Sequence, residues 1–425
     1  MEEKRIKLYL GKIRIYKKYI IQLILIYLLL QYQGGTFYYT HNEFFKPLIF
    51  GAFSIALVVN FKKIKDKNLI IFTFAICVLI FMISLINANE TGINTILEIV
   101  GTIIFTYIIV MIDSENVLTV YVRLVSFLAL MSLICFALIQ ISNNGLLSFM
   151  IHSRGEKNDL FFGGIFYTIR YVWYYDLRNC GIFTEPGLYC VALISGMFIL
   201  LFMENELNLS KRQKRRTFFV LICTILSTMS AAGLMSLGTL LLLYLFSKPK
   251  SNITKNNIKK YILIMILIGT VIIIADYAVN GMNSFIYTYV LSKMSVQQLE
   301  IEGNTGNARL TTIIFCINTL ILHPLGVGMT YVTGRLPQYA VGAKYLIFIA
   351  SYGIVTSIIF YFFIIKNIFG KNACGIFGAI AFIGSYIIMS SAQSMIFYPC
   401  FMLIVLIYRK RKLQNVRIKY NNPGI

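Results

Sequence analysis

The sequence is poor in acidic residues and in the side chains that soluble enzymes most often use for catalysis. Of its 425 residues, 17 are aspartate or glutamate and three are histidine, whereas 39 are lysine or arginine. It contains no CxxC pair, no cluster of histidine with cysteine, no P-loop and no DxD-like acidic motif. Neither a zinc site nor a disulfide framework is therefore indicated, and we expect no metal ion and no cofactor.

Charged residues are scarce in general, which excludes an ordinary soluble protein. Only 13% of the residues are charged and 58% are apolar, and apolar runs long enough to cross a bilayer recur from end to end. We therefore predict an all-α polytopic membrane protein with a single integral membrane domain over residues 1–425. The basic N-terminal segment has no small-residue cleavage site, so we predict no removable signal peptide.

The apolar runs predict about twelve transmembrane helices and two long external loops. One loop covers residues 142–185 and the other covers residues 280–342. Within the second loop, the apolar residues 310–322 are too few for a span of about 20 residues, so we predict a short interfacial or re-entrant helix there. The predicted spans are residues 19–32, 44–61, 68–88, 93–112, 117–141, 186–203, two within 217–246, 261–279, 343–365, 373–392 and 395–408.

Residues 217–246 form one apolar run for which two structures are possible. One is a hairpin of two short helices that turns at residues 230–233, and the other is a single long tilted helix. Both flanks of the run are basic, and basic loops gather on the cytoplasmic side. With the hairpin, both termini are cytoplasmic and 29 of the 39 lysines and arginines lie inside. We therefore favour the hairpin, and the same rule explains the net charge of +22 better than nucleic-acid binding does.

Several cations remain in the two external loops, against this tendency. All three histidines are external in this topology as well. The arginine side chain presents a planar fork of donors that matches phosphate oxygens, so these residues together favour a polyanion-binding pocket. Alternatively, each arginine anchors its loop by pairing with an acid such as Asp159 or Glu300. The external cations beside motif-like sequence are Arg154, Lys157, Arg170, Arg178, Arg309 and Arg335.

The first external loop ends in Glu185, directly before a predicted span. A carboxylate there is a candidate general base, or it simply stabilises the N-terminus of the following helix. Upstream, Trp173 and Tyr174 belong to a dense aromatic group that either stacks on sugar rings or lies at the membrane interface. Glu98 and Asp276 stand near outer ends of spans and do not form the chain of ionisable groups expected of a proton-coupled transporter.

The end of the first loop carries a motif that resembles a known family. Residues 178–186 read RNCGIFTEP, which resembles the R-x-x-G-x-F-x-E-P motif of Wzy-type O-antigen and capsular polysaccharide polymerases and the related O-antigen ligases. Arg170 precedes Gly181 with the R-x10-G spacing described for polymerase loops. In the second loop, Arg309 and the segment HPLGVG, residues 323–328, look like the family's "G-R … P-x-G-x-G" stretch.

The chain also departs from the family pattern. The arginine of the family's "S-R-G" hairpin is absent from residues 230–233, and the second loop does not repeat R-x10-G. Gly342 occupies the position where ligases typically carry a histidine, which favours a polymerase. His323 is a poor substitute for that histidine because it precedes the Pro-Leu-Gly turn rather than the span.

The resemblance implies a metal-independent glycosyltransferase that joins polyprenyl-diphosphate-linked oligosaccharide repeat units on the outer face of the bacterial cytoplasmic membrane. Its partners would be that lipid-linked substrate, the lipid bilayer, and a chain-length regulator and flippase, with no nucleic acid. The alternatives are an O-antigen ligase, a flippase of lipid-linked oligosaccharides, and a structural lipid-binding membrane protein. The expected catalytic residues are Arg178, Arg309 and Glu185, and the expected substrate-binding residues are Arg170, Arg335, His323, Trp173 and Tyr174.

Overall fold

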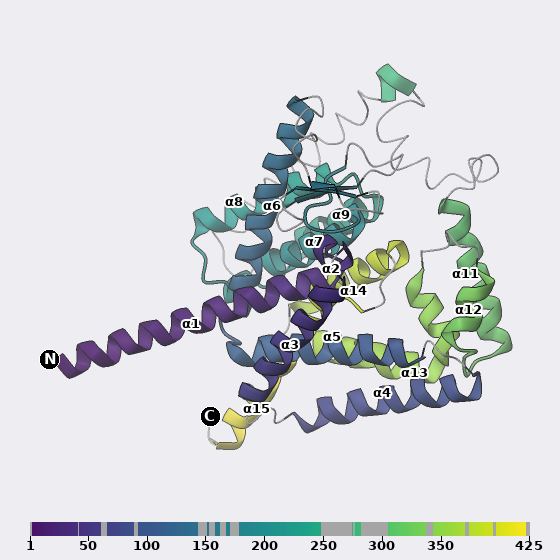
Figure 1. Cartoon of the computed structure of the whole chain (residues 1–425), viewed down its shortest axis with the longest axis horizontal. Helices are drawn as coiled ribbons and strands as arrows, with labels where there is room; N and C mark the ends of the chain where they lie inside the picture. The colour runs from purple at the N-terminus through teal and green to yellow at the C-terminus, as the bar shows by residue number, and fades with distance from the viewer. Residues whose placement is uncertain are drawn as a thin grey trace. The chain divides into compact units, whose positions relative to one another are not determined.

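The protein consists of two compact units, each assembled from segments that are far apart in the sequence. Unit 1 comprises Met1–Lys67, Gly101–Thr228 and Tyr398–Ile425, and unit 2 comprises Asn68–Val100 and Met229–Phe397. Both units are mainly helical (Figure 1). The computed structural model describes residues 2–40, 42–60, 66–88, 92–142, 151–152, 158–161, 167–170, 178–247, 274, 277–281, 305–336, 343–369, 374–393 and 397–421.

Unit 1 is organised around the apolar helix α7 (Pro186–Phe202), in which every residue from 186 to 201 is buried. A helix that is apolar on all sides must be enclosed by other elements. Accordingly, α7 packs against α6 (Val117–Ile141), α8 (Lys211–Ser227) and α15 (Pro399–Asn421). The unit also contains α1 (Glu2–Tyr32), α2 (Thr36–Thr40), α3 (Asn42–Asn60), the second part of α5 (Gly92–Ile112) and the short helix η4 (Glu204–Glu206).

Unit 2 contains two groups of packed helices. In one, α14 (Gly375–Ala392) lies along α9 (Ala231–Phe246). The two helices approach closely at Gly384, where an added Cβ atom would lie 3.4 Å from the Thr239 methyl group. Small residues at such positions allow membrane helices to pack closely. In the other group, α11 (Thr305–Leu322) and α12 (Met329–Arg335) pack against α13 (Lys344–Ile368). The unit also includes most of α4 (Lys67–Ile86) and the first part of α5.

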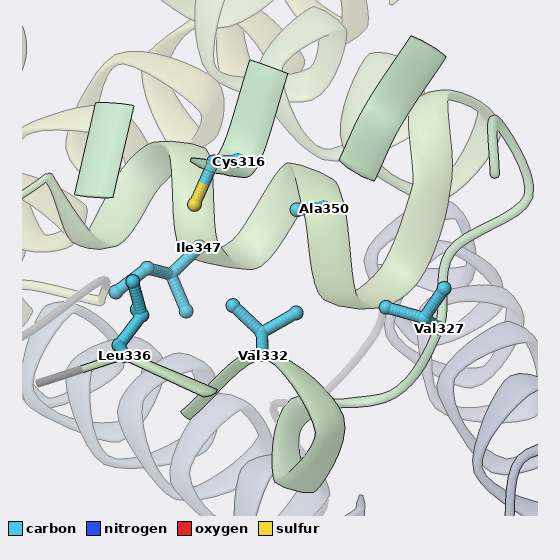
Figure 2. Packing of buried hydrophobic residues seen from close by; sticks show 6 residues of the cluster. All are labelled: Cys316, Val327, Val332, Leu336, Ile347 and Ala350. Atoms are coloured by element: carbon cyan, nitrogen blue, oxygen red, sulfur yellow. The ribbon is translucent and has the colours of Figure 1, made fainter. Parts of the chain in front are cut away.

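An apolar cluster fastens α11, α12 and the segment between them to α13 (Figure 2). In lipid there is no hydrophobic driving force between helices, so close packing of this kind holds them together. The buried side chains of the cluster are Cys316, Val327, Val332, Leu336, Ile347 and Ala350.

The structure confirms the class of polytopic helical membrane protein. Among the described residues, six helices are long and apolar enough to cross a membrane, and all six coincide with predicted spans. Three more apolar helices are shorter: Pro186–Phe202, Ala231–Phe246 and Thr311–Leu322. The total of twelve spans stays a prediction, and the predicted span at residues 261–279 falls almost wholly outside the described residues. The six helices are Glu43–Asn60, Lys67–Ile86, Gly92–Ile112, Val117–Ile141, Lys344–Ile368 and Gly375–Ala392.

The long apolar run of residues 217–246 is broken, as predicted, into two helices. The break falls at residues 228–230, between α8 and α9, slightly earlier than the turn that we predicted. Met229 adopts a positive φ of 47°, which ends the helical path. Ser230 then caps α9, because its side-chain oxygen accepts a hydrogen bond from the Gly233 N–H at 3.4 Å.

Both loops predicted to be external contain more regular structure than the sequence indicated. Helix α11 begins at Thr305 and has 18 residues, so it is longer than the short helix predicted at residues 310–322. The first loop contains a three-stranded antiparallel sheet in the order β1-β2-β3, which we did not predict. Its strands are β1 (Ile151–His152), β2 (Asn158–Phe161) and β3 (Tyr167–Arg170), and Asn158 pairs with Arg170.

Candidate functional site

The motif that carries the family resemblance forms a buried segment before α7. We call residues 178–185 the strap. Asn179, Cys180 and Ile182 are completely buried and Arg178 is 9% exposed, although the strap belongs to a segment that reads as an external loop. A buried backbone without regular secondary structure needs hydrogen-bond partners for its polar groups. The strap finds them on elements from four parts of unit 1.

Asn179 is the centre of these contacts. Its backbone N–H donates to the Ser227 carbonyl oxygen at the end of α8, at 3.0 Å. Its side-chain NH2 group donates to the hydroxyl oxygens of Ser132 on α6 and of Ser227, at 3.1 and 3.0 Å. Its side-chain oxygen accepts the Gly181 N–H at 3.0 Å. Because every polar atom of this side chain has a partner, Asn179 fixes the strap against α6 and α8.

The strap also pairs with the end of α1. The Thr36 N–H donates to the Ile182 carbonyl oxygen at 2.9 Å, and the Thr184 N–H donates to the Gly34 carbonyl oxygen at 3.1 Å. Gly35 and Phe183 form an isolated antiparallel bridge between these bonds. The sequence QGGT therefore serves as an edge for the strap, and this partner could not be identified from the sequence alone.

The third partner of the strap is the sheet in the same loop. The Thr168 N–H of β3 donates to the Gly181 carbonyl oxygen at 2.7 Å. The neighbouring Tyr167 is fully buried, and this burial raises the pKa of the Tyr167 hydroxyl well above its ordinary value. The Tyr167 hydroxyl is therefore neutral, and its ring packs in the interior of unit 1.

Gly181 is required by the geometry of the strap. Its φ is +56°, and an added Cβ atom would lie 2.5 Å from the Tyr189 ring. That ring stacks on Phe183 with centroids 5.6 Å apart, and its hydroxyl shares a hydrogen bond of 2.9 Å with the Ser132 hydroxyl. The spacing between Arg178 and Gly181 thus reflects a tight turn against α7.

Glu185 occupies the N-cap position of α7, directly before Pro186 at the first helical position. Its backbone is extended, with φ −138° and ψ 143°, and its side chain makes no capping hydrogen bond. The residue is half-buried. The carboxylate is therefore not committed to hydrogen bonding with the helix terminus, although its position still benefits from the helix dipole.

The other predicted residues of the first loop are only partly covered. Arg170 lies at the end of β3, in the strand that joins the strap, but the placement of its side chain lies outside the description. Trp173 and Tyr174 lie outside the described residues. In unit 1 the structure therefore places Arg178 and Glu185 on one continuous buried strap, with the backbone of Arg170 on an attached strand.

In unit 2, the PLGVG segment of the second loop fills a break in α13. Gly353 has φ 75° and ψ 173° and interrupts the helix. The Val327 and Gly328 N–H groups donate to the carbonyl oxygens of Ala350 and Ser351, at 3.2 and 2.9 Å. In return, the Ile354 N–H donates to the Pro324 carbonyl oxygen at 2.9 Å. A broken membrane helix must recover its lost hydrogen bonds, and the loop supplies them here.

The exposed residues around this break include two of the predicted substrate-binding residues. His323 is exposed immediately before the loop. Arg335 is exposed at the end of α12, where it donates a hydrogen bond of 2.6 Å to the Tyr331 hydroxyl and lies 4.1 Å from the centroid of the Tyr331 ring. Arg309 lies on α11, but its side chain is outside the description. Arg309, His323 and Arg335 belong to unit 2, whereas Arg178 and Glu185 belong to unit 1.

A second polar group in unit 2 links α5 to α13. Glu98 interacts electrostatically with Lys344, and both side chains are half-buried. One turn away, the Tyr352 hydroxyl donates to the Thr95 hydroxyl at 2.8 Å. Nothing in the sequence indicates that Lys344 is a neighbour of Glu98. Asp276 lies outside the described residues.

The side chains described in each unit, such as Arg178 in unit 1 and Arg335 in unit 2, are suited to binding an anion or a polar substrate. Among the described residues, no group of three or more His, Cys, Asp and Glu side chains is placed to hold a metal ion. The arginines and Glu185 were predicted from the sequence, whereas Asn179, Gly35 and Gly353 were not. Asn179 acts mainly through its side chain, and Gly35 and Gly353 act through their backbones. Their partners lie on distant segments, so no local signal in the sequence points to them.

Comparison with models of known protein families and with curated protein sequences finds no match to this chain.

Proposed function

We propose that the protein polymerises lipid-linked oligosaccharide repeat units at the outer face of the bacterial cytoplasmic membrane. The proposal rests on the resemblance of residues 178–186 to the motif of Wzy-type polymerases. One observation supports it most: Arg178 and Glu185 stand at the two ends of a buried strap that leads directly into the central helix α7. A cation and a carboxylate held on one rigid segment suit a reaction that releases a diphosphate and moves a proton.

In the proposed reaction, the growing glycan is attached to a polyprenyl diphosphate. A sugar hydroxyl of the next repeat unit attacks the anomeric carbon, and the bond from that carbon to the phosphate oxygen breaks. The electron pair leaves with the diphosphate, and the hydroxyl proton passes to a base, for which Glu185 is the candidate. Arg178 stabilises the charge that develops on the leaving group. Because its guanidinium is almost buried, that interaction is weakly screened by water.

The resemblance gives Arg309 the same task as Arg178, and it gives Arg170 the first position of the R-x10-G pattern. We further propose that His323, Arg335, Trp173 and Tyr174 contact the glycan or its carrier. These assignments are tested one residue at a time, since each substitution should lower polymer formation without removing the protein from the membrane.

The decisive experiment is reconstitution of the purified protein with a synthetic lipid-linked repeat unit, with polymer formation as the measurement. Arg178→Ala should abolish the ladder of products, and Arg178→Lys should lower the rate by about tenfold or more, because lysine keeps the charge but loses the planar fork. Arg215→Ala is the matched control, because Arg215 is exposed on α8 and far from the motif in sequence. Normal polymer from both Arg178 variants would contradict the proposal.

Two alternatives are separated by different results. A ligase would leave finished polymer on the lipid carrier in a deletion strain, whereas loss of a polymerase leaves single repeat units; a gel of the surface glycan distinguishes them. If the protein were a flippase, a purified polymerisation system would still form polymer when this protein is left out.

A further inference from the structure

Unit 1 contains a small polar cavity that the proposed function does not use. It has a volume of about 120 Å³ and lies where α5 turns into α6. Its walls come from α1, from this turn, from α6 and from the segment before α8. The lining residues are Tyr19, Asp113, Asn116, Thr119, Arg123 and Asn208.

The cavity is built by hydrogen bonds between distant parts of the chain. Asn208 donates its backbone N–H to the Thr119 hydroxyl at 3.0 Å and its side-chain NH2 to the Asn116 side-chain oxygen at 2.8 Å. The Arg123 guanidinium donates to the Asn208 carbonyl oxygen at 3.3 Å. On the α1 side, Gln22 donates to the Asp113 carbonyl oxygen at 2.8 Å. These contacts fix the walls of the cavity.

Two opposite charges line the cavity and do not neutralise each other. Among the described residues, no ion pair joins Asp113 to Arg123. The Asp113 carboxylate accepts from the N–H groups of Glu115 and Asn116, at 3.1 and 3.3 Å, and from the Asn116 side chain at 2.9 Å. A carboxylate has about four acceptor positions, so it can still accept a cation. Arg123 keeps donors beyond the one that Asn208 uses.

The location and size of the cavity restrict its ligand. The turn of residues 113–116 joins two helices that are long and apolar enough to cross a membrane, so it lies at a bilayer surface. The Arg123 guanidinium donates to the carbonyl oxygen of Asn208, whose side chain bonds to Asn116 in this turn, so the charge lies near the same surface. Sites for larger organic ligands measure about 300–1,000 Å³, so 120 Å³ excludes an oligosaccharide and admits only a small polar group.

We propose that this cavity binds the zwitterionic headgroup of an aminophospholipid, with the phosphate on Arg123 and the ammonium on Asp113. Basic pockets between membrane helices are known to bind lipid headgroups. Here the Asp113 carboxylate lines the same cavity as Arg123, so the site favours a ligand that carries both a negative and a positive charge. The site is independent of the proposed glycosyl transfer, since none of its residues belongs to the strap or to the second loop.

The test is native mass spectrometry of the full-length protein purified in detergent and supplied with phosphatidylethanolamine, phosphatidylglycerol or phosphatidylcholine. The wild type should retain phosphatidylethanolamine in preference to the other two lipids. Asp113→Asn and Arg123→Gln should each lower this retention by about tenfold, because each removes a charge-assisted hydrogen bond. Arg215→Ala, at an exposed position on α8, should retain the lipid as the wild type does.

Several results would overturn the proposal. Equal retention of phosphatidylglycerol would exclude a role for Asp113 in binding an ammonium group. Equal retention of phosphatidylcholine would exclude recognition of a primary ammonium. Soluble phosphoethanolamine that stabilises the protein as strongly as the lipid does would exclude a membrane source. A thermal melt of each variant checks folding, and Asp113→Glu, which keeps the charge, should restore selectivity if Asp113→Asn loses it through charge rather than misfolding.

Discussion

At the scale of single residues, Gly326 and Gly353 allow the second loop to enter the break in α13. Both have positive φ, at +93° and +75°. A Cβ atom on Gly326 would lie 2.6 Å from the Gly353 nitrogen, and one on Gly353 would collide with the Leu325 and Pro324 backbone. Backbone atoms cannot move aside as a flexible side chain can. Gly326 and Gly353 therefore have a structural role that is separate from any contact with substrate.

Replacing either glycine by alanine should destabilise unit 2. We expect Gly353→Ala and Gly326→Ala to lower the free energy of unfolding by about 1–3 kcal/mol, the usual cost of a strained backbone conformation. Thermal unfolding in detergent measures this change. Gly334→Ala is the control in the same unit, because an added Cβ there meets nothing within 4 Å. If Gly353→Ala melted like Gly334→Ala, the close approach of the two backbones would be wrong.

Asn179 has a comparable role in unit 1, through its side chain. Asn179→Ala removes two hydrogen bonds to serine hydroxyls and one from the Gly181 N–H. We expect it to lower the stability by about 1–3 kcal/mol, because buried polar groups lose their partners. Chemical unfolding of the purified protein measures the loss, with Asn205→Ala at an exposed position as the control. Unchanged stability of Asn179→Ala would show that the strap is held by its backbone contacts alone.

At the scale of elements, α15 is fixed to the segment before α4 by a nearly buried ion pair. Arg409 donates two hydrogen bonds to the Asp66 carboxylate, at 2.6 and 2.7 Å. The exposed fractions of the two side chains are 14% and 6%. Such a planar, two-bond pair specifies how two elements meet. Lys410 adds a hydrogen bond of 3.2 Å to the Val110 carbonyl oxygen at the end of α5.

Removing one partner of this pair should cost more than removing both. We expect Asp66→Asn or Arg409→Gln to destabilise unit 1 by about 3–5 kcal/mol, since each leaves a charge buried without its partner. The double variant should lose less than the sum of the single losses, because neither charge remains. A double-mutant cycle of unfolding free energies measures the coupling. Strict additivity of the two losses would contradict a direct interaction.

At the scale of the whole molecule, the direction of the chain through the membrane follows from the break between α8 and α9. With a hairpin, the segment before α8 is cytoplasmic and the segment that contains α12 is external. With a single crossing, both segments would be cytoplasmic, and 13 of the 29 inner cations would move outside. The break itself is present in the structure, whereas the sidedness is a prediction from the positive-inside rule.

Cysteine labelling of intact cells distinguishes these two topologies. In a variant without the eight native cysteines, a membrane-impermeant thiol reagent should label Thr333→Cys but not Asn205→Cys, both at exposed positions. Permeabilised cells, in which both positions should react, provide the control. Protection of both positions in intact cells would favour the single long crossing and would place the second loop away from an extracytoplasmic substrate.

The sequence by itself determined the membrane class, the positions of six long apolar helices to within a few residues, and the break in residues 217–246. These depend on composition, run length and charge, which act locally. It also made Arg178 and Glu185 candidates for the site, since charges are conspicuous in an apolar chain. Only the tertiary structure decided that the motif is a buried strap, that α13 is broken at Gly353 and that Asp66 pairs with Arg409. Each of these depends on which distant backbone or side chain satisfies a polar group, and hydrophobic patterning carries no information about such partners.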